Sequence, residues 1–209
     1  MGEDMRIVNK FIEKMRWGVF SAINRIVFRL QGFEVGAGFR SNGRICVKNL
    51  GGGITIGNNV RINSSRNYNP IGNGLRTTIE LLPGGSLKIG NNVGFSNTTI
   101  VCSREVSIGD YVDIGDNVKI YDTDFHSLNP FLRSSKNDYN KAAKKKISIS
   151  DHSFIGTNTI ILKGSKIGKC SIIGAGSIVT GTIPDYEIWG GNPARFIRKL
   201  TEKEKEQEF

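Results

Sequence analysis

From residue 149 onward, an aliphatic side chain recurs at every sixth position. Residues 149–184 divide into the blocks ISDHSF, IGTNTI, ILKGSK, IGKCSI, IGAGSI and VTGTIP. The first position of each block is Ile or Val, and the fifth position is small or β-branched. Helices repeat about every 3.6 residues and strands every two, so neither element produces this period. The pattern predicts a solenoid in which three blocks form one triangular coil and the first positions stack inside it.

The same period extends toward the N-terminus in a less regular form. IGNNVR at 56–61 and IGNNVG at 89–94 are clean blocks, whereas residues 64–76 break the phase and predict a loop. Cys102 then takes an aliphatic position, which favours a small core residue over a nucleophile. Gly and Asn at the second to fourth positions suit the corners because they tolerate positive φ. The sequence therefore predicts a mainly β protein, a parallel β-helix of hexapeptide repeats.

Two segments depart from the repeat. Residues 4–30 carry apolar and basic side chains at helical spacing, which predicts an amphipathic helix. We expect it to cap the open end of the solenoid or to bind an anionic membrane surface, and the two roles are compatible. Residues 121–146 interrupt a repeat that is intact on both sides, so they predict an external loop that leaves and re-enters at a corner. The expected division is a helical cap at 1–32, a β-helix domain at 33–188 with the loop 121–146, and a C-terminal extension at 189–209.

The charge balance limits the classes of partner that we expect. The chain has 29 Lys and Arg against 19 Asp and Glu, a formal net charge of +10. A basic protein binds nucleic acid, an anionic membrane or an anionic small molecule, and no nucleic-acid-binding motif is present, so we expect no nucleic acid partner. The chain has no run of 18 apolar residues, no apolar region at its start, and three scattered cysteines. These features favour a cytoplasmic protein. Its N-terminal helix is a candidate for peripheral contact with the inner membrane face.

His126 is the candidate catalytic residue. It lies in the segment DTDFHS, where the repeat gives way to the loop. An imidazole can act as a general base near neutral pH, and Asp122 or Asp124 is expected to orient its ring. The alternative is an exposed loop histidine without a role. His152 takes the fourth position of its block and is interpreted as a solvated corner residue. Because the chain has only two histidines, a three-histidine zinc site within one chain is excluded and no metal is expected.

The segments IIGAGSIVT and GNPARFIRKL, together with DTDFHS and the basic loop after it, resemble the hexapeptide-repeat acyltransferases. The resemblance covers roughly residues 50–200 and is strongest to the sugar O-acetyltransferase branch, which includes maltose, galactoside, capsule and O-antigen acetyltransferases. It implies a left-handed β-helix and a homotrimer that binds acetyl-CoA between subunits. It also implies that His126 activates an acceptor hydroxyl, which attacks the thioester directly.

The resemblance assigns further residues. It implies that Thr157 and Ala175 contact CoA through backbone groups, next to Thr180 and Gly181. It places Arg195 and Arg198 near the CoA phosphates and Asn97 near the acceptor. The residue chemistry agrees in part, because guanidinium groups pair well with phosphates. Gly181 departs from the family, since many relatives carry Lys at that position.

The sequence therefore predicts an acetyl-CoA-dependent O-acetyltransferase that modifies a sugar hydroxyl in polysaccharide or lipopolysaccharide biosynthesis. The acceptor is expected to be a small-molecule or lipid-linked sugar. One alternative keeps the fold and changes the acceptor, to an amino-sugar nucleotide for N-acylation or to a xenobiotic. Another alternative, from a different class, is a non-catalytic trimeric scaffold.

Overall fold

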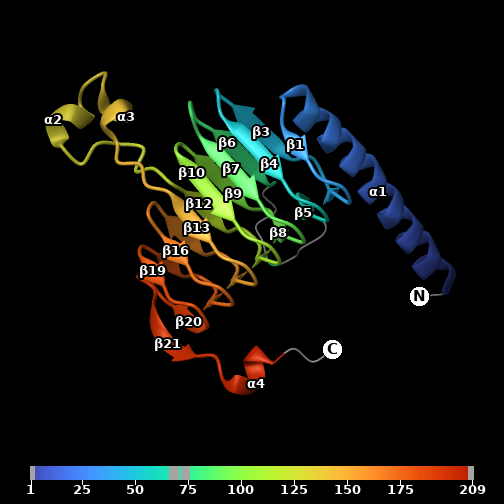
Figure 1. The fold of residues 1–209 in the computed structure, drawn as a ribbon. Coiled ribbons are helices and arrows are strands. Elements are labelled where there is room, and N and C mark those ends of the chain that lie inside the picture. The colour runs from blue at the N-terminus through green and yellow to red at the C-terminus, as the bar shows by residue number, and fades with distance from the viewer. Residues whose placement is uncertain (1–2, 66–70, 72–75, 207–209) are drawn as a thin grey trace.

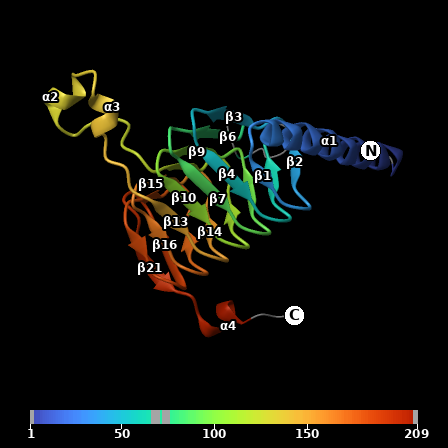
Figure 2. The same cartoon turned by 45° about the horizontal axis from the view of Figure 1, so that its top comes forward.

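The computed structural model describes residues 3–65, 71 and 76–206, and it shows a triangular coil of parallel strands (Figures 1 and 2). Sheet A contains β1 (Glu34–Val35), β4 (Gly53–Ile56), β7 (Ser86–Ile89), β10 (Glu105–Ile108), β13 (Ile147–Ile149), β16 (Lys166–Ile167) and β19 (Thr182–Ile183). Sheet B contains β2 (Arg40–Asn42), β5 (Arg61–Asn63), β8 (Gly94–Ser96), β11 (Asp113–Ile114), β14 (Phe154–Ile155), β17 (Ile172–Ile173), β20 (Glu187–Gly190) and β21 (Arg195–Lys199). Sheet C contains β3 (Cys46–Asn49), β6 (Thr78–Leu81), β9 (Thr99–Cys102), β12 (Lys119–Tyr121), β15 (Ile160–Leu162) and β18 (Ile178–Val179). The predicted left-handed parallel β-helix is confirmed.

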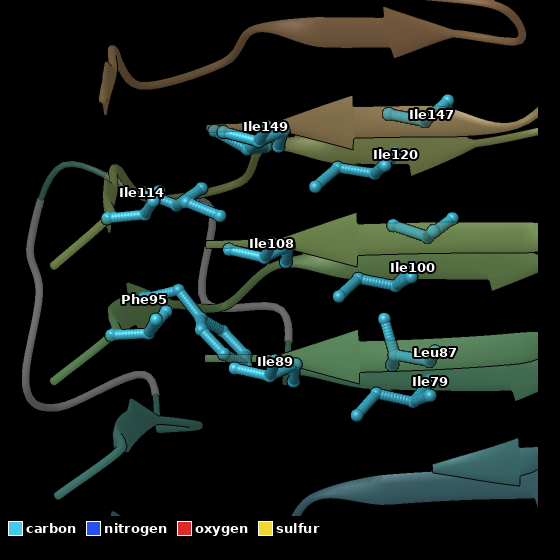
Figure 3. Packing of buried hydrophobic residues seen from close by; sticks show 14 of the residues in the cluster. Ile79, Leu87, Ile89, Phe95, Ile100, Ile108, Ile114, Ile120, Ile147 and Ile149 are labelled. Atoms are coloured by element: carbon cyan, nitrogen blue, oxygen red, sulfur yellow. The ribbon is translucent and has the colours of Figure 1, made fainter. Parts of the chain in front are cut away.

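The aliphatic first positions form the core. Ile89, Ile108 and Ile149 are equivalent residues of successive coils in sheet A, and each is at most 3% exposed. Figure 3 shows these three side chains stacked in one column, beside a second column from sheet C. Apolar burial contributes roughly 1.5–3 kcal/mol for each such side chain. The six-residue period is therefore the spacing at which the chain returns an aliphatic residue to the interior.

The fifth positions hold the coils together with hydrogen bonds. Ser153 Oγ donates to the carbonyl of Gly168 at 2.9 Å, and Ser165 Oγ donates to the carbonyl of Val179 at 3.0 Å. Both serines are buried, and each bond reaches the next coil. A buried hydroxyl needs such a partner, because an unpaired polar group inside the core costs free energy.

The corners explain the glycines and asparagines in two different ways. The fourth position has positive φ in coil after coil, whatever residue occupies it: Asn92 has φ 56°, His152 57° and Cys170 56°. The glycine at the second position has another cause, because a Cβ on Gly156 would lie 2.5 Å from the backbone nitrogen of Ala175. The prediction that these residues tolerate positive φ is thus right for the fourth position, whereas close stacking explains the second.

The helix α1 (Glu3–Leu30) lies at the N-terminal end of the solenoid (Figure 1). Its C-terminal half covers the first coil, where Phe28 is fully buried beside Phe33 and Phe39. Asn24 donates from Nδ2 to Ser41 Oγ at 2.9 Å and to the carbonyl of Gly43 at 2.8 Å. The cap interpretation therefore describes this half of the helix. None of the described helices combines the length and the hydropathy needed to cross a bilayer.

The C-terminal residues extend sheet B. β20 pairs in parallel with β17, and β21 then turns back and pairs antiparallel with β20. The short helix α4 (Glu202–Lys205) follows and begins with a capping box between Thr201 and Glu204. The loop predicted at residues 64–76 falls largely outside the described residues.

Candidate active site

The external loop predicted at residues 121–146 is present, and it lies between sheets C and A. It leaves after β12, carries α2 (Pro130–Arg133) and α3 (Asp138–Lys141), and returns to β13, projecting from the side of the solenoid (Figure 1). A short antiparallel stem closes its base. The N–H of Asp124 donates to the carbonyl of Ala143 at 3.0 Å, and the N–H of Lys145 donates to the carbonyl of Asp122 at 2.9 Å. The two ends of the loop are therefore fixed to each other and to the coil.

Asp122 anchors the solenoid and does not orient His126. It is fully buried, and its carboxylate accepts the backbone N–H groups of Ser103, Arg104 and Glu105 at 2.7–2.8 Å. These donors belong to the corresponding corner of the preceding coil. The role expected for Asp122 beside the imidazole is thus corrected, because its oxygens are already engaged in stacking one coil on another.

Asp124 is likewise directed elsewhere. Its Oδ1 pairs with Lys163 Nζ at 2.7 Å, so the carboxylate ties the base of the loop to the next coil. Its backbone carbonyl accepts the N–H of His126 at 2.7 Å. Asp124 therefore fixes the backbone at His126 but does not contact the ring, which corrects the second orienting role expected from the sequence.

The carboxylate that contacts the imidazole is Asp138, at the start of α3. Its Oδ2 lies 2.5 Å from His126 Nδ1, and its Oδ1 accepts the N–H of Ser127 at 2.7 Å. The hydrogen bond with His126 is the main reason that the pKa of Asp138 is lowered, and the bond from Ser127 adds to it. In a neutral imidazole, donation from Nδ1 to this carboxylate leaves Nε2 as the proton acceptor. The His126 side chain is 69% exposed, so a substrate can reach it.

Sequence reasoning missed Asp138, and the reason is geometric. Residue 138 lies within the loop, outside the six-residue period, so no register relates it to His126. The one signal in the sequence that points to Asp138 is that it is an acidic residue in the same insertion as His126. The turn Asn129–Pro130 that begins α2, where Asn129 accepts the N–H of Phe131 at 2.9 Å, helps to fold the loop back on itself.

The backbone before His126 is strained. Phe125 has φ 61°, a left-handed conformation that bulky side chains rarely adopt. The Phe125 ring packs against Tyr121 at a centroid distance of 5.5 Å, and its N–H donates to Thr123 Oγ1 at 3.1 Å. Strain of this kind costs on the order of 1–3 kcal/mol and clusters at functional sites. Here it sets the direction in which His126 leaves the loop stem.

The residues expected to bind CoA lie along two edges of sheet C. Thr157 and Ala175 belong to the corner between sheets B and C, before β15 and β18 respectively. Thr180 and Gly181 follow β18 at the corner between sheets C and A, which is the corner that also carries the His126 loop. Ala175, Thr180 and Gly181 are exposed. Within one chain the strands of sheet C separate the two groups.

Asn97 is buried at the corner between sheets B and C. Its Nδ2 donates to Asp116 Oδ2 at 2.8 Å, and both side chains are 1% exposed. Burial raises the pKa of the Asp116 carboxyl, although the Asn97 hydrogen bond acts in the opposite direction. The structure thus shows Asn97 bound to Asp116 inside the coil, with β9 between it and the His126 corner.

The two arginines of β21 differ in their partners. Arg198 forms a bidentate pair with Glu204, with N–O distances of 2.7 and 2.8 Å. The Arg198 hydrogen bonds lower the pKa of Glu204 to about 2, with help from Thr201. Arg195 is exposed, and its Nη1 donates to the carbonyl of Ala194 at 3.3 Å. Arg195 is therefore better placed to meet a phosphate, because the charge of Arg198 is already matched.

The outer face of sheet C is apolar at its C-terminal end. Val101 pairs with Tyr121 and Tyr121 with Leu162, while Ile160 pairs with Ile178. These side chains alternate with the core residues and are half-buried. The equivalent outward positions of sheet A carry Lys88, Ser107, Ser148 and Lys166. The outer surface of sheet C, between the two candidate corners, is thus more apolar than that of sheet A, and sheet B also carries the outward apolar residues Phe154, Ile172 and Ile188.

Two other chemistries receive no support from the described residues. No group of three His, Cys, Asp or Glu side chains converges there as a set of metal ligands. Cys102 is buried, as predicted, and burial together with the nearby Asp122 raises the pKa of its thiol to about 12. That thiol stays protonated and is a poor nucleophile.

Comparison with known proteins shows which proteins the chain resembles. No protein-family model matches the chain. A galactoside O-acetyltransferase from Lactococcus lactis is 38% identical over 122 residues, 55% of this chain and 56% of that protein. A solved hexapeptide-repeat acetyltransferase from Vibrio cholerae is 32% identical with a TM-score of 0.51, over 56% of this chain and 64% of the other. The chain resembles the hexapeptide-repeat acyltransferases.

The likeness to these acyltransferases extends over most of the fold. AntD, an N-acyltransferase from Bacillus cereus solved as a variant with dTDP and coenzyme A, has a TM-score of 0.63 and 26% identity. That alignment covers 84% of this chain and 89% of the other. The chain spans little more than half the length of the Lactococcus relative. The resemblance predicted from the hexapeptide motifs, including the sugar O-acetyltransferase branch, is confirmed.

Proposed function

We propose that this chain is an acetyl-CoA-dependent O-acetyltransferase that acts on a sugar hydroxyl. The observation that carries the proposal is the His126–Asp138 pair, held on a strained loop stem at the corner that also exposes Thr180 and Gly181. The galactoside O-acetyltransferase relative supports the acceptor class. An exposed imidazole that is hydrogen-bonded to a carboxylate can act as the general base that deprotonates an alcohol.

The proposed reaction is a direct transfer. Nε2 of His126 takes the proton of the acceptor hydroxyl while the hydroxyl oxygen attacks the thioester carbonyl carbon. Asp138 stabilises the imidazolium that forms, in the manner of an orienting carboxylate. The tetrahedral intermediate collapses with cleavage of the C–S bond, and the CoA sulfur leaves with the proton from His126. The products are an acetyl ester and free CoA, and no acyl-enzyme is needed.

A neighbouring copy completes the site in this proposal. Thr157 and Ala175 lie on one edge of sheet C, and Thr180 and Gly181 lie on the other, beside His126. Packing the apolar outer face of sheet C against another copy would bury Tyr121, Leu162 and Ile178 and bring unlike corners together. We therefore propose a homotrimer in which acetyl-CoA lies between subunits and Arg195 meets its phosphates.

The acceptor we propose is a sugar, free or lipid-linked, modified in the cytoplasm during polysaccharide or lipopolysaccharide synthesis. The acceptor contact expected of Asn97 stays a prediction, and it requires that the Asn97–Asp116 pair rearrange or act through its neighbours. A second candidate is N-acylation of an amino-sugar nucleotide. The AntD likeness favours this second candidate, since it covers most of the chain.

The test is release of CoA thiol from acetyl-CoA by the purified protein, with a panel of sugars and a panel of amino-sugar nucleotides. We expect thiol release that depends on a sugar alcohol and yields an acetyl ester. Turnover confined to amino sugars would select the second candidate. If the protein neither bound nor turned over any acyl-CoA, the proposal would be wrong and the non-catalytic scaffold would be the remaining interpretation.

A further inference from the structure

The helix α1 docks on the solenoid through a face that combines polar and aromatic side chains. Ser21 Oγ accepts the N–H of Ser41 at 2.9 Å, and Asn24 contacts Ser41 and Gly43 through both Nδ2 hydrogen bonds. Farther along the same side, Phe28 enters the core, and the Arg40 guanidinium lies 5.6 Å from the centre of the Trp17 ring. Helical residues advance about 100° each, so these contacts belong to one face of the helix.

The apolar stripe of α1 lies on the opposite face. Phe11, Met15, Val19 and Ile26 follow each other at spacings of four, four and seven, which places them on one side and about half a turn from Asn24. These side chains are 68%, 54%, 51% and 58% exposed, respectively. The stripe begins at Val8 and continues to Leu30 at the other end of the helix, over roughly 33 Å.

This orientation differs from the usual one. A surface helix normally turns its apolar stripe to its own core. Here the solenoid contacts a mixed face, held by the Asn24 and Ser21 hydrogen bonds and by the buried Phe28, and the longer apolar stripe is left in solvent. A continuous exposed apolar surface of this size marks a site of interaction, because covering it releases water from the surface and lowers the free energy. The stripe is therefore a docking surface rather than part of the fold.

The charge of α1 indicates which kind of partner covers the apolar stripe. The sequence of α1 has six basic residues, Arg6, Lys10, Lys14, Arg16, Arg25 and Arg29, against the three acidic residues Glu3, Asp4 and Glu13, which gives a net charge of +3. Arg6, Lys10 and Lys14 are exposed, next to the half of the stripe that projects beyond the solenoid. A second copy of α1 would bring like charges together, whereas anionic headgroups would neutralise them.

We propose that α1 binds the surface of an anionic lipid bilayer, with its apolar stripe in the interface and its axis parallel to the membrane. Helices with an apolar stripe and a basic polar face bind membranes in this way. The N-terminal end of the solenoid would then face the membrane, and the β20–β21 hairpin at the other end would face away from it (Figure 1). This inference stands on α1 alone and does not depend on the proposed acetyl transfer.

The experiment is co-sedimentation of the full chain with phosphatidylcholine vesicles, plain or containing about 30% phosphatidylglycerol. We expect at least ~10-fold tighter binding to the anionic vesicles. The double substitution Phe11→Gln and Met15→Gln should reduce that binding by at least ~10-fold. The matched control Asn9→Gln, an exposed polar residue of the same helix, should stay within about twofold of the unchanged chain.

A second variant tests the charge argument separately. Lys10→Gln with Lys14→Gln should weaken binding to anionic vesicles, and the loss should shrink as salt is raised. Thiol release with a water-soluble acceptor should be the same in every variant, because the substituted side chains are exposed and lie outside the candidate site. Binding that is absent, or that is unchanged in the Phe11 and Met15 variant, would overturn the proposal. Self-association that this variant abolishes in sedimentation velocity would assign the stripe to a second copy instead.

Discussion

The coils at 149–183 and the loop at 122–146 adjoin at one corner of the solenoid, but different interactions determine their structures. In the coils, position decides the structure: the first residue of a block is buried, and before the last block, which contains β19, the fourth has positive φ and the fifth is a buried Ser or Thr that hydrogen-bonds, as Ser165 does to the next coil. In the loop no contact repeats, and each polar group has a particular partner, such as Asp138 for His126. The regular part supplies stability, and the irregular part supplies the candidate chemistry.

The two histidines show the same contrast. His152 takes the fourth position of a coil, with φ 57°, and its ring stacks on Tyr111, the fourth residue of an adjacent coil, at 4.8 Å. His126 lies outside the repeat and pairs with a carboxylate from α3. One residue type thus serves as a corner in one region and as a candidate base in the other, so His152 provides a matched control for His126.

The largest expected effect is on turnover. His126→Ala should lower kcat by at least ~10², because the acceptor hydroxyl loses its general base, while the affinity for acetyl-CoA stays similar. His152→Asn keeps a residue that tolerates positive φ and should leave kcat within about twofold. Steady-state thiol release measures both. Near-full turnover in the His126 variant would move the base to another residue.

The next effect is on the stability of the coils. Gly156→Ala would set a Cβ 2.5 Å from the nitrogen of Ala175 and should lower the free energy of unfolding by about 1–3 kcal/mol. Gly53→Ala, in β4, would meet nothing within 4 Å and is the matched control. Urea denaturation compares them. Equal stability of the two variants would show that close stacking does not require glycine at the second position.

The third effect distinguishes the aspartates of the loop. Asp138→Asn should lower kcat about tenfold with little change in KM for acetyl-CoA, since it removes the charge that stabilises the imidazolium. Asp138→Glu should restore part of the activity. Asp124→Asn should have the smaller effect on kcat, because that carboxylate contacts Lys163. A larger effect from Asp124 than from Asp138 would favour the assignment made from the sequence.

A smaller effect is expected at β21. Arg195→Ala should raise KM for acetyl-CoA several-fold and reduce the dependence of KM on salt, because a cation facing the phosphates is removed. Arg198→Ala should raise KM less, since Glu204 already matches that charge. Initial rates at two ionic strengths test this ranking. Equal KM values for both variants and the unchanged chain would remove β21 from the CoA site.

The smallest effect is a pH dependence at the C-terminus. The folded pKa of Glu204 is lowered from 4.5 to about 2, chiefly by Arg198. A lowered carboxyl pKa stabilises the folded state above the unfolded pKa, and that contribution is lost as pH falls from about 4.5 toward 2. An NMR titration of the Glu204 carboxyl should show the low value, and Arg198→Gln should return it toward 4.5. An unchanged titration in that variant would contradict the pairing.

The sequence was sufficient for the parts that repeat. Register links Ile108, Ile149 and Ile167 in space because each lies one coil from the next, so the core and the corners follow from spacing alone. The candidate base His126 was found because it interrupts the repeat. Asp138 was not found, and Asp122 and Asp124 received its role, because contacts inside the loop depend on how α2 and α3 fold back. The outward direction of the α1 stripe could be seen only in the structure, because a helical period does not determine which face of the helix contacts the solenoid.

The central claim is that His126 receives the acceptor proton beside a thioester held between copies of this chain. A structure of the assembled protein with CoA bound tests it most directly. We predict that the CoA thiol lies within hydrogen-bonding reach of the His126 imidazole, with the pantetheine arm along the Gly174–Gly176 corner of a neighbouring copy. A thiol bound away from His126, or a CoA held within a single chain, would contradict the account.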